Sequence, residues 1–205
     1  MIKQTLTIAF IYVLSILGFT TLASRSYAAD NNVKTIAINA KKSSVHWIGK
    51  KIVGQHSGSV NIQTGNIVIK NELLAGGYFV IDMRSLKNED LKDASYNKKL
   101  VNHLRSADFF NVTEYPTATA KITKVSVISP NEYSVTADFT IKGITKSVTF
   151  PTTLKTGGNG YKGNANITLD RTLWDIRYGS SSFFEGIGDK AIKNEFELKV
   201  NIVSN

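Results

Sequence analysis

Residues that could do acid–base or metal chemistry are few in this sequence, which has three histidines and no cysteine. His46, His56 and His103 are too far apart to share one helix face at the i, i+4 spacing of metal-binding pairs. His46 alternates with Trp47 and should face outward where Trp47 faces inward. His56 lies in a glycine-flanked segment, and His103 lies on the polar side of a predicted helix. We therefore expect surface or hydrogen-bonding histidines, with no catalytic residue and no metal site.

The carboxylates give no clearer sign of catalysis. A general acid and a general base must be held together in one cleft, whereas the candidate aspartates fall mostly in turns or at outward positions of the strand pattern. These aspartates are Asp82, Asp138, Asp170 and Asp175. The sequence also lacks the G-x-S-x-G element of a serine hydrolase and the Lys-Ser/Thr that a Gly-rich phosphate loop requires.

The elements that would position such residues are strands, because apolar residues recur at every second position from Val45 onward. The clearest run is YSVTADFTI, residues 133–141, in which alternate residues share one face: Tyr133, Val135, Ala137, Phe139 and Ile141. Short turn sequences separate eight or more such runs, with no repeat period. This pattern predicts an all-β domain that either stacks as a sandwich or closes on itself.

One segment departs from this period and predicts a helix over residues 94–105, with Asp93 as its N-cap. Its apolar stripe consists of Tyr96, Leu100 and Leu104. The segment that follows, SADFFNVTEYP, places Phe109 beside Phe110 in a polar connection. Adjacent side chains of an extended segment point to opposite sides, so we expect the pair to fasten the helix to the sheet. The alternative is a peripheral apolar cluster without a ligand role.

The first 28 residues read as a secretory signal peptide. A lysine at position 3 precedes an apolar run from about Leu6 to Leu22, and small residues at Ser26 and Ala28 predict cleavage after Ala28. An uncleaved membrane anchor is the alternative, because the run nearly reaches the length of a spanning helix. Without cysteine there is no site for a lipid anchor, so we expect a free periplasmic or secreted domain over residues 29–205.

The chain is basic, with 25 Lys and Arg against 16 Asp and Glu and a formal net charge of +9. The basic residues are spread thinly, whereas nucleic-acid binders usually concentrate them on one face with aromatic residues between. We therefore expect no nucleic-acid partner and interpret the charge as serving solubility. Transient contact with a membrane surface and a homodimer stay open.

Several quoted stretches together resemble one known family. They are GQHSGSVNIQTGNI (54–67), FVIDMRSL (79–86), HLRSADFFNVTEYPTATA (103–120), ADFTIKGITKSVTFP (137–151) and DRTLWDIRYG (170–179). In this order they closely resemble the YceI-like family of bacterial secreted lipid-binding proteins, over about residues 43–203. The resemblance implies a lipocalin-like antiparallel β-barrel of eight strands with one helix near an end. It also implies an apolar lumen that holds a polyisoprenoid chain such as an isoprenoid quinone.

On this basis a set of inward and helix residues is predicted to bind the ligand. The set is Trp47, Phe79, Ile81, Leu100, Leu104, Phe109, Phe110, Phe139, Ile141, Val148, Phe150, Ile167, Leu169, Arg171 and Trp174. For each aromatic residue the alternative is plain core packing. For Arg171 the alternative to contacting a head group is an ion-pair cluster with Asp170 and Arg177 at the barrel rim.

The predicted function is non-catalytic binding, storage or transport of a long isoprenoid-type lipid, with no cofactor required. The alternative is a hydrolase or isomerase that acts on an apolar lipid through a histidine at the barrel mouth, which requires a buried histidine beside a carboxylate. A third interpretation is a solidly packed barrel whose outer face binds a protein partner.

Overall fold

The computed structural model describes residues 32–157 and 160–204, so the predicted signal peptide lies outside the described residues. In these ranges the chain forms nine strands, one α-helix and two short 3-10 helices. The strands are β1 (Val33–Ala37), β2 (Ser44–Lys51), β3 (Gln55–Lys70), β4 (Leu73–Asn88), β5 (Thr117–Ser129), β6 (Glu132–Ile141), β7 (Ile144–Gly157), β8 (Gly160–Asp170) and β9 (Ile192–Val203). The helices are α1 (Ala94–Arg105), η1 (Arg171–Trp174) and η2 (Gly188–Lys190).

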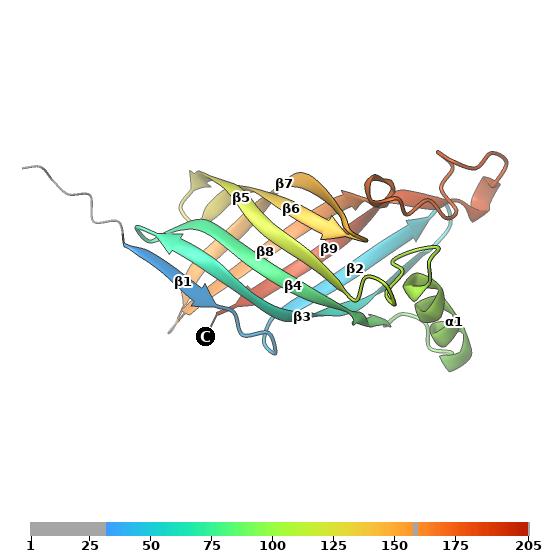
Figure 1. Ribbon diagram of the computed structural model, residues 1–205, viewed down its shortest axis with the longest axis horizontal. Helices are drawn as coiled ribbons and strands as arrows, with labels where there is room; N and C mark the ends of the chain where they lie inside the picture. Colours follow the sequence, from blue (N-terminus) through green and yellow to red (C-terminus); the bar gives the residue numbers. More distant parts are fainter. Residues whose placement is uncertain (1–31, 158–159, 205) are drawn as a thin grey trace, which may run out of the picture. The chain divides into compact units, whose positions relative to one another are not determined.

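The strands from β2 to β9 close into an antiparallel barrel (Figure 1). Each pairs with the next along the chain, and β2 pairs with β9 to complete the ring. Along the edge of β3 that does not face β4, β2 pairs with residues 55–60 and β1 with residues 66–70, so β1 extends the line of β2. The predicted fold class, a lipocalin-like antiparallel barrel of eight strands with one helix near an end, is confirmed.

The alternation read from the sequence sets the inside and the outside of the wall. In β6 the residues Tyr133, Val135, Ala137, Phe139 and Ile141 are all buried, and the residues between them are partly exposed. Burying an apolar side chain contributes roughly 1.5–3 kcal/mol to stability. A register slip by one residue would turn this whole set outward and lose that contribution, so the pattern fixes the register. Closing the sheet also removes unpaired strand edges.

One end of the barrel carries the longer connections. The β2–β3 turn, the connection between β4 and β5 with α1, and the connection between β8 and β9 all lie there (Figure 1). Helix α1 has the predicted bounds, and the Asp93 carboxylate accepts hydrogen bonds from the backbone N–H groups of Ser95 (2.8 Å) and Tyr96 (3.0 Å). The predicted stripe is correct for Leu104, which packs against the core, and wrong for Tyr96, which is exposed.

Phe109 and Phe110 lie in a tight series of turns, so the extended segment expected from the sequence is wrong. The Phe109 N–H donates to Ser106 O (3.1 Å) and the Phe110 N–H to Leu104 O (3.1 Å). The two rings still pack against two different elements. Phe109 meets His103 of α1 edge-on at 5.0 Å between ring centroids, and Phe110 meets Phe196 of β9 at 6.5 Å. The pair therefore fastens the helix to the barrel, as predicted.

Candidate functional site

The barrel encloses a cavity whose walls are mainly apolar. Every strand from β2 to β9 contributes inward side chains, among them Val60 on β3 and Leu198 on β9, and α1 adds Leu100 and Leu104. The space that the centre of a water molecule can reach is about 280 Å³. A binding site of this kind is concave and lined by hydrophobic side chains, with a few polar groups that fix orientation.

Most of the residues predicted to bind a ligand lie on this cavity. Those that line it are Trp47, Phe79, Ile81, Leu100, Leu104, Phe109, Phe110, Phe139, Ile141, Phe150, Ile167, Leu169 and Arg171. Val148 and Trp174 lie outside the lining. Val148 is half-buried against the core, and Trp174 is fully buried with its indole N–H donating to Phe139 O (3.1 Å). Trp174 is therefore a core residue that anchors η1 to the wall of the barrel.

The prediction omitted inward residues of similar character. They are Val45, Val60, Ile62, Ile67, Leu74, Met83, Leu86, Ala118, Ala120, Ile122, Val135, Ala137, Leu154, Ala165, Ile176, Ile192, Phe196, Leu198, Val200 and Ile202. Nearly all lie on strands, where the two-residue period already assigns them to the inner face. The prediction therefore covered only part of the inner face, and the residues that it omitted include some as large as Met83 and Phe196.

The end of the barrel away from α1 is filled by side chains. Ile69 and Tyr133 are buried in a cluster with Ile67, Leu74 and two further residues, yet neither lines the cavity. Ile67 and Leu74 do line it, so the apolar tube reaches this cluster and stops there. A ligand would thus enter from the other end.

Charged lining residues and His56 lie at that other end, where the β2–β3 turn meets the start of β9. Lys50, Lys51, His56, Lys193 and Glu195 all border the cavity there. The Lys50 ammonium pairs with the Glu197 carboxylate on the neighbouring strand, and this hydrogen bond lowers the pKa of Glu197. The mouth is therefore charged where the interior is apolar.

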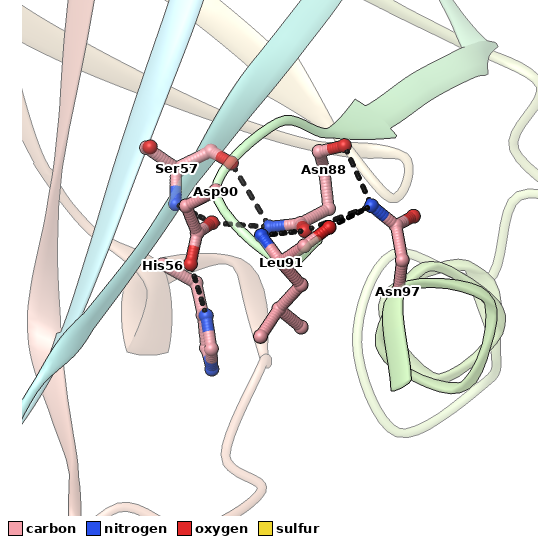
Figure 2. A network of polar contacts seen from close by, with 6 residues as sticks. All are labelled: His56, Ser57, Asn88, Asp90, Leu91 and Asn97. Atoms are coloured by element: carbon pink, nitrogen blue, oxygen red, sulfur yellow. Dashed lines mark hydrogen bonds and ion pairs between the residues drawn. The ribbon is translucent and has the colours of Figure 1, made fainter. Parts of the chain in front are cut away.

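A polar network also lies at the mouth and centres on Asp90 (Figure 2). One carboxylate oxygen lies 2.8 Å from Nδ1 of His56, and the other accepts from the Ser57 N–H (2.8 Å) and from the Asn88 side-chain amide. Burial acts to raise the pKa of Asp90, but the hydrogen bonds from Ser57, His56 and Asn88 outweigh it and hold this pKa below its usual value. Asp90 is thus a fixed carboxylate behind the His56 ring.

The same network holds the start of α1 against the barrel. The Asn97 side-chain amide, on the first turns of α1, donates to Asn88 O (3.0 Å), Leu91 O (3.1 Å) and Asn88 Oδ1 (3.2 Å). Asn88 Oδ1 also accepts from the Leu91 N–H (3.1 Å). Figure 2 shows Asn97 reaching from the helix toward Asn88 at the end of β4. The helix is therefore fixed beside the mouth by side-chain amides, in addition to its apolar contacts.

The other two histidines also face carboxylates. His46 Nδ1 lies 3.4 Å from Glu89, and His103 Nε2 lies 2.9 Å from Asp108. His56 and His103 are thus hydrogen-bonding residues and His46 is a surface residue that faces outward, within the expectation of surface or hydrogen-bonding histidines. In residues 32–157 and 160–204 no group of three or more His, Asp or Glu side chains is arranged to hold a metal ion. Within the same ranges no helix has the length and apolarity to cross a bilayer.

Sequence comparison identifies the fold family. A family model described as the YceI-like domain matches residues 37–204. The chain belongs to the YceI-like family. It is 51% identical over 47 residues to Protein YceI of Shigella flexneri, covering 23% of this chain and 24% of that protein. It is 37% identical over 94 residues to a UPF0312 protein of Pseudomonas putida F1, covering 42% and 49%. These matches span from a quarter to a half of the relatives' lengths.

Solved structures share the fold of this YceI-like domain. BcnA of Burkholderia cenocepacia superposes with a TM-score of 0.65 at 23% identity, covering 80% of this chain and 98% of BcnA. A polyisoprenoid binding domain from Saccharophagus degradans gives a TM-score of 0.59 at 12% identity, covering 82% and 97%. At these identities the likeness supports the barrel architecture alone.

Arg171 of this YceI-like domain is a buried cation bound to the backbone. Its guanidinium donates to Ile176 O (2.7 Å), Ile192 O (3.1 Å) and Lys193 O (3.1 Å), and burial lowers its pKa while nearby Asp170 acts to raise it. The ion-pair cluster with Asp170 and Arg177 does not form. Asp170 caps η1 through the Thr172 N–H (2.9 Å), and Arg177 pairs with Asp175 (2.7 Å). Contact between Arg171 and a ligand remains a prediction.

Proposed function

We propose that this YceI-like protein binds a long isoprenoid-type lipid in the barrel lumen, for storage or transport and without a catalytic step. The observation that carries the proposal is the apolar cavity, which all strands from β2 to β9 line and whose charged lining residues lie at one end. An isoprenoid quinone has the matching form, a slender hydrocarbon tail with one polar head. The polyisoprenoid-binding barrel with the same fold supports this cargo class.

The energetics favour a tail rather than a compact ligand. Burying a methylene contributes roughly 0.8 kcal/mol, so two or three prenyl units of about five carbons each contribute roughly 8–12 kcal/mol. Association costs on the order of 4–15 kcal/mol. A tail of this length is therefore enough to offset much of that cost, and longer tails give stable binding with few polar contacts.

Exposed apolar side chains at the mouth end could contact a membrane from which the lipid is taken up. Ile52 and Val53 project from the β2–β3 turn, and Phe183 and Phe184 from the connection before β9. The Ile52 N–H donates to Ala191 O (3.2 Å), so the turn lies beside the start of β9. We include in the proposal a periplasmic or secreted location and a transient contact of this end with a bilayer, through which a lipid passes without crossing water.

Direct extraction tests the cargo. Protein purified from its native host without denaturants should release one class of isoprenoid lipid in stoichiometric amount, measured by mass spectrometry. Lipid transfer from vesicles should slow when Ile52 and Val53 are replaced by serine. The matched control replaces Val127 and Ile128, which are also apolar and exposed but lie at the end of β5, at the other end of the barrel. Protein that carries no lipid would contradict the proposed cargo. Equal slowing by the two pairs of substitutions would contradict the proposed membrane contact of the mouth end.

A hydrolase or isomerase acting on an apolar lipid is a second candidate, because His56 and the Asp90 carboxylate lie together at the cavity mouth. The His56 side chain is 30% exposed, not buried as that alternative requires. Incubation of the protein with isoprenyl esters should leave them unchanged under the carrier proposal. Turnover that is lost in His56→Phe would instead establish the enzyme.

A further inference from the structure

His56 is an inward-facing polar residue at the open end of an apolar tube. On β3 it precedes Gly58, Val60 and Ile62 at two-residue spacing, and Val60 and Ile62 are buried and line the cavity. The His56 side chain lines the same cavity and is 30% exposed. The ring therefore lies where the tail of a bound lipid would end and its head group would begin.

Asp90 determines which ring nitrogen carries hydrogen. Its Oδ1 already accepts from the Ser57 N–H and the Asn88 amide, and its Oδ2 lies 2.8 Å from His56 Nδ1. A carboxylate is only an acceptor, so Nδ1 must donate and the neutral ring leaves Nε2 as an acceptor. Figure 2 shows the second ring nitrogen pointing away from Asp90, and in residues 32–157 and 160–204 it has no hydrogen-bond partner.

We propose that Nε2 of His56 accepts a hydrogen bond from a hydroxyl group on the head of the cargo. The cargo is then an isoprenoid alcohol or a quinol, since an ether or an oxidised quinone has no O–H to donate. This inference rests on the proposed lipid-binding function and assigns the head group that the cavity alone does not. Among the cations that border the mouth, Lys50 is paired with Glu197, and the Asp90 carboxylate behind the ring adds negative charge. Lys51 and Lys193 also border the mouth, so a monophosphate probe tests directly for an anionic head.

The test compares probes that differ only at the head. A C20 isoprenoid alcohol, its methyl ether and its monophosphate are titrated into lipid-free protein, with the fluorescence of cavity-lining Trp47 as the signal. The alcohol should bind about fivefold more tightly than the ether, the effect of one neutral hydrogen bond. His56→Phe should abolish this ratio and leave ether binding in place. His46→Phe is the matched control, because His46 also faces a carboxylate of the same connection but does not line the cavity.

Asp90→Asn tests the mechanism without removing the ring. The Ser57 N–H and the Asn88 amide both donate to Oδ1, so the amide oxygen must stay there and its NH₂ group must face His56 Nδ1. Nδ1 then accepts, and Nε2 becomes a donor that serves alcohol and ether alike. The alcohol-to-ether ratio should fall to about one although His56 is present.

The outcomes separate this inference from the proposed function. A ratio that survives both His56→Phe and Asp90→Asn would overturn the hydroxyl contact while leaving a lipid carrier. A monophosphate that binds more tightly than the alcohol would overturn it in favour of an anionic head. Binding of none of the probes to the wild-type protein would overturn the proposed function as well.

Discussion

Ala165 offers a direct test of whether the barrel is hollow, because its side chain lies on β8, lines the cavity and is only half-buried. The change Ala165→Phe puts a ring into the space where a lipid tail would lie. That ring displaces about one prenyl unit of five carbons, and at roughly 0.8 kcal/mol per carbon the loss is about 4 kcal/mol. A loss of this size weakens binding of an isoprenoid about a thousandfold.

The same change has a second consequence for stability. In a hollow lumen the new ring gains apolar contacts without displacing protein atoms, so the lipid-free variant should melt at an unchanged or higher temperature. In a filled core an added ring forces neighbours apart and costs about 1–3 kcal/mol. Calorimetric melting of lipid-free protein and a lipid titration together measure both effects. The matched control is Asn166→Phe, one residue along β8 and exposed on the outer face.

Destabilisation of Ala165→Phe by the amount typical of a filled core, with lipid affinity unchanged, would refute the hollow barrel. The lipid carrier would then lose its physical basis, whereas the fold would not be affected. An equal loss of affinity in Asn166→Phe would show that the effect does not come from the lumen.

Three further changes probe the structure around the cavity. Arg171→Met leaves three backbone carbonyls without their buried donor and should lower the free energy of unfolding, measured by urea titration, by about 3–5 kcal/mol. The control Arg177→Met breaks an exposed ion pair and should lower the free energy of unfolding by well under 1 kcal/mol. Asn97→Ala removes the amide that ties α1 to the end of β4, so backbone hydrogen exchange over residues 91–105 should accelerate while that of β6 does not. The hydrogen bond from Lys50 lowers the pKa of Glu197, so the ionised pair stabilises the fold above about pH 4 and this stabilisation is lost as the pH falls further. The melting temperature of Glu197→Gln should therefore decline less than that of the wild type between about pH 5 and pH 2. An identical decline in both proteins would contradict the pairing.

The parts of the fold that depend on local sequence could be read directly from it. The period of two gave β6 with the correct inner face, and Asp93 marked the start of α1 because capping involves only neighbouring residues. The Phe109 and Phe110 contacts were anticipated for the wrong reason, since the segment turns where an extended chain was expected. Pattern arguments are weakest in such connections, where backbone hydrogen bonds do not follow a period.

The polar network at the mouth could not be read from the sequence. His56 and Asp90 are 34 positions apart, and their contact depends on the pairing of β3 with β4 and on the path of the chain after Asn88. Asn97 lies outside the stripe of Tyr96, Leu100 and Leu104 that the sequence predicts, and only the structure shows that its amide is half-buried on the face of α1 that meets the barrel. The glycine-flanked setting of His56 was visible, but the carboxylate that orients its ring becomes evident only when the strands are paired.

Why this barrel is hollow follows from the size of its inward residues. The interior of an eight-stranded barrel is just wide enough for side chains to fill, so a cavity requires small residues at inner positions. Three strands supply them: Ala118 and Ala120 on β5, Ala137 on β6, and Gly163 and Ala165 on β8 all line the cavity. Strand alternation therefore closes the barrel, and the small residues within that alternation leave space for a tail.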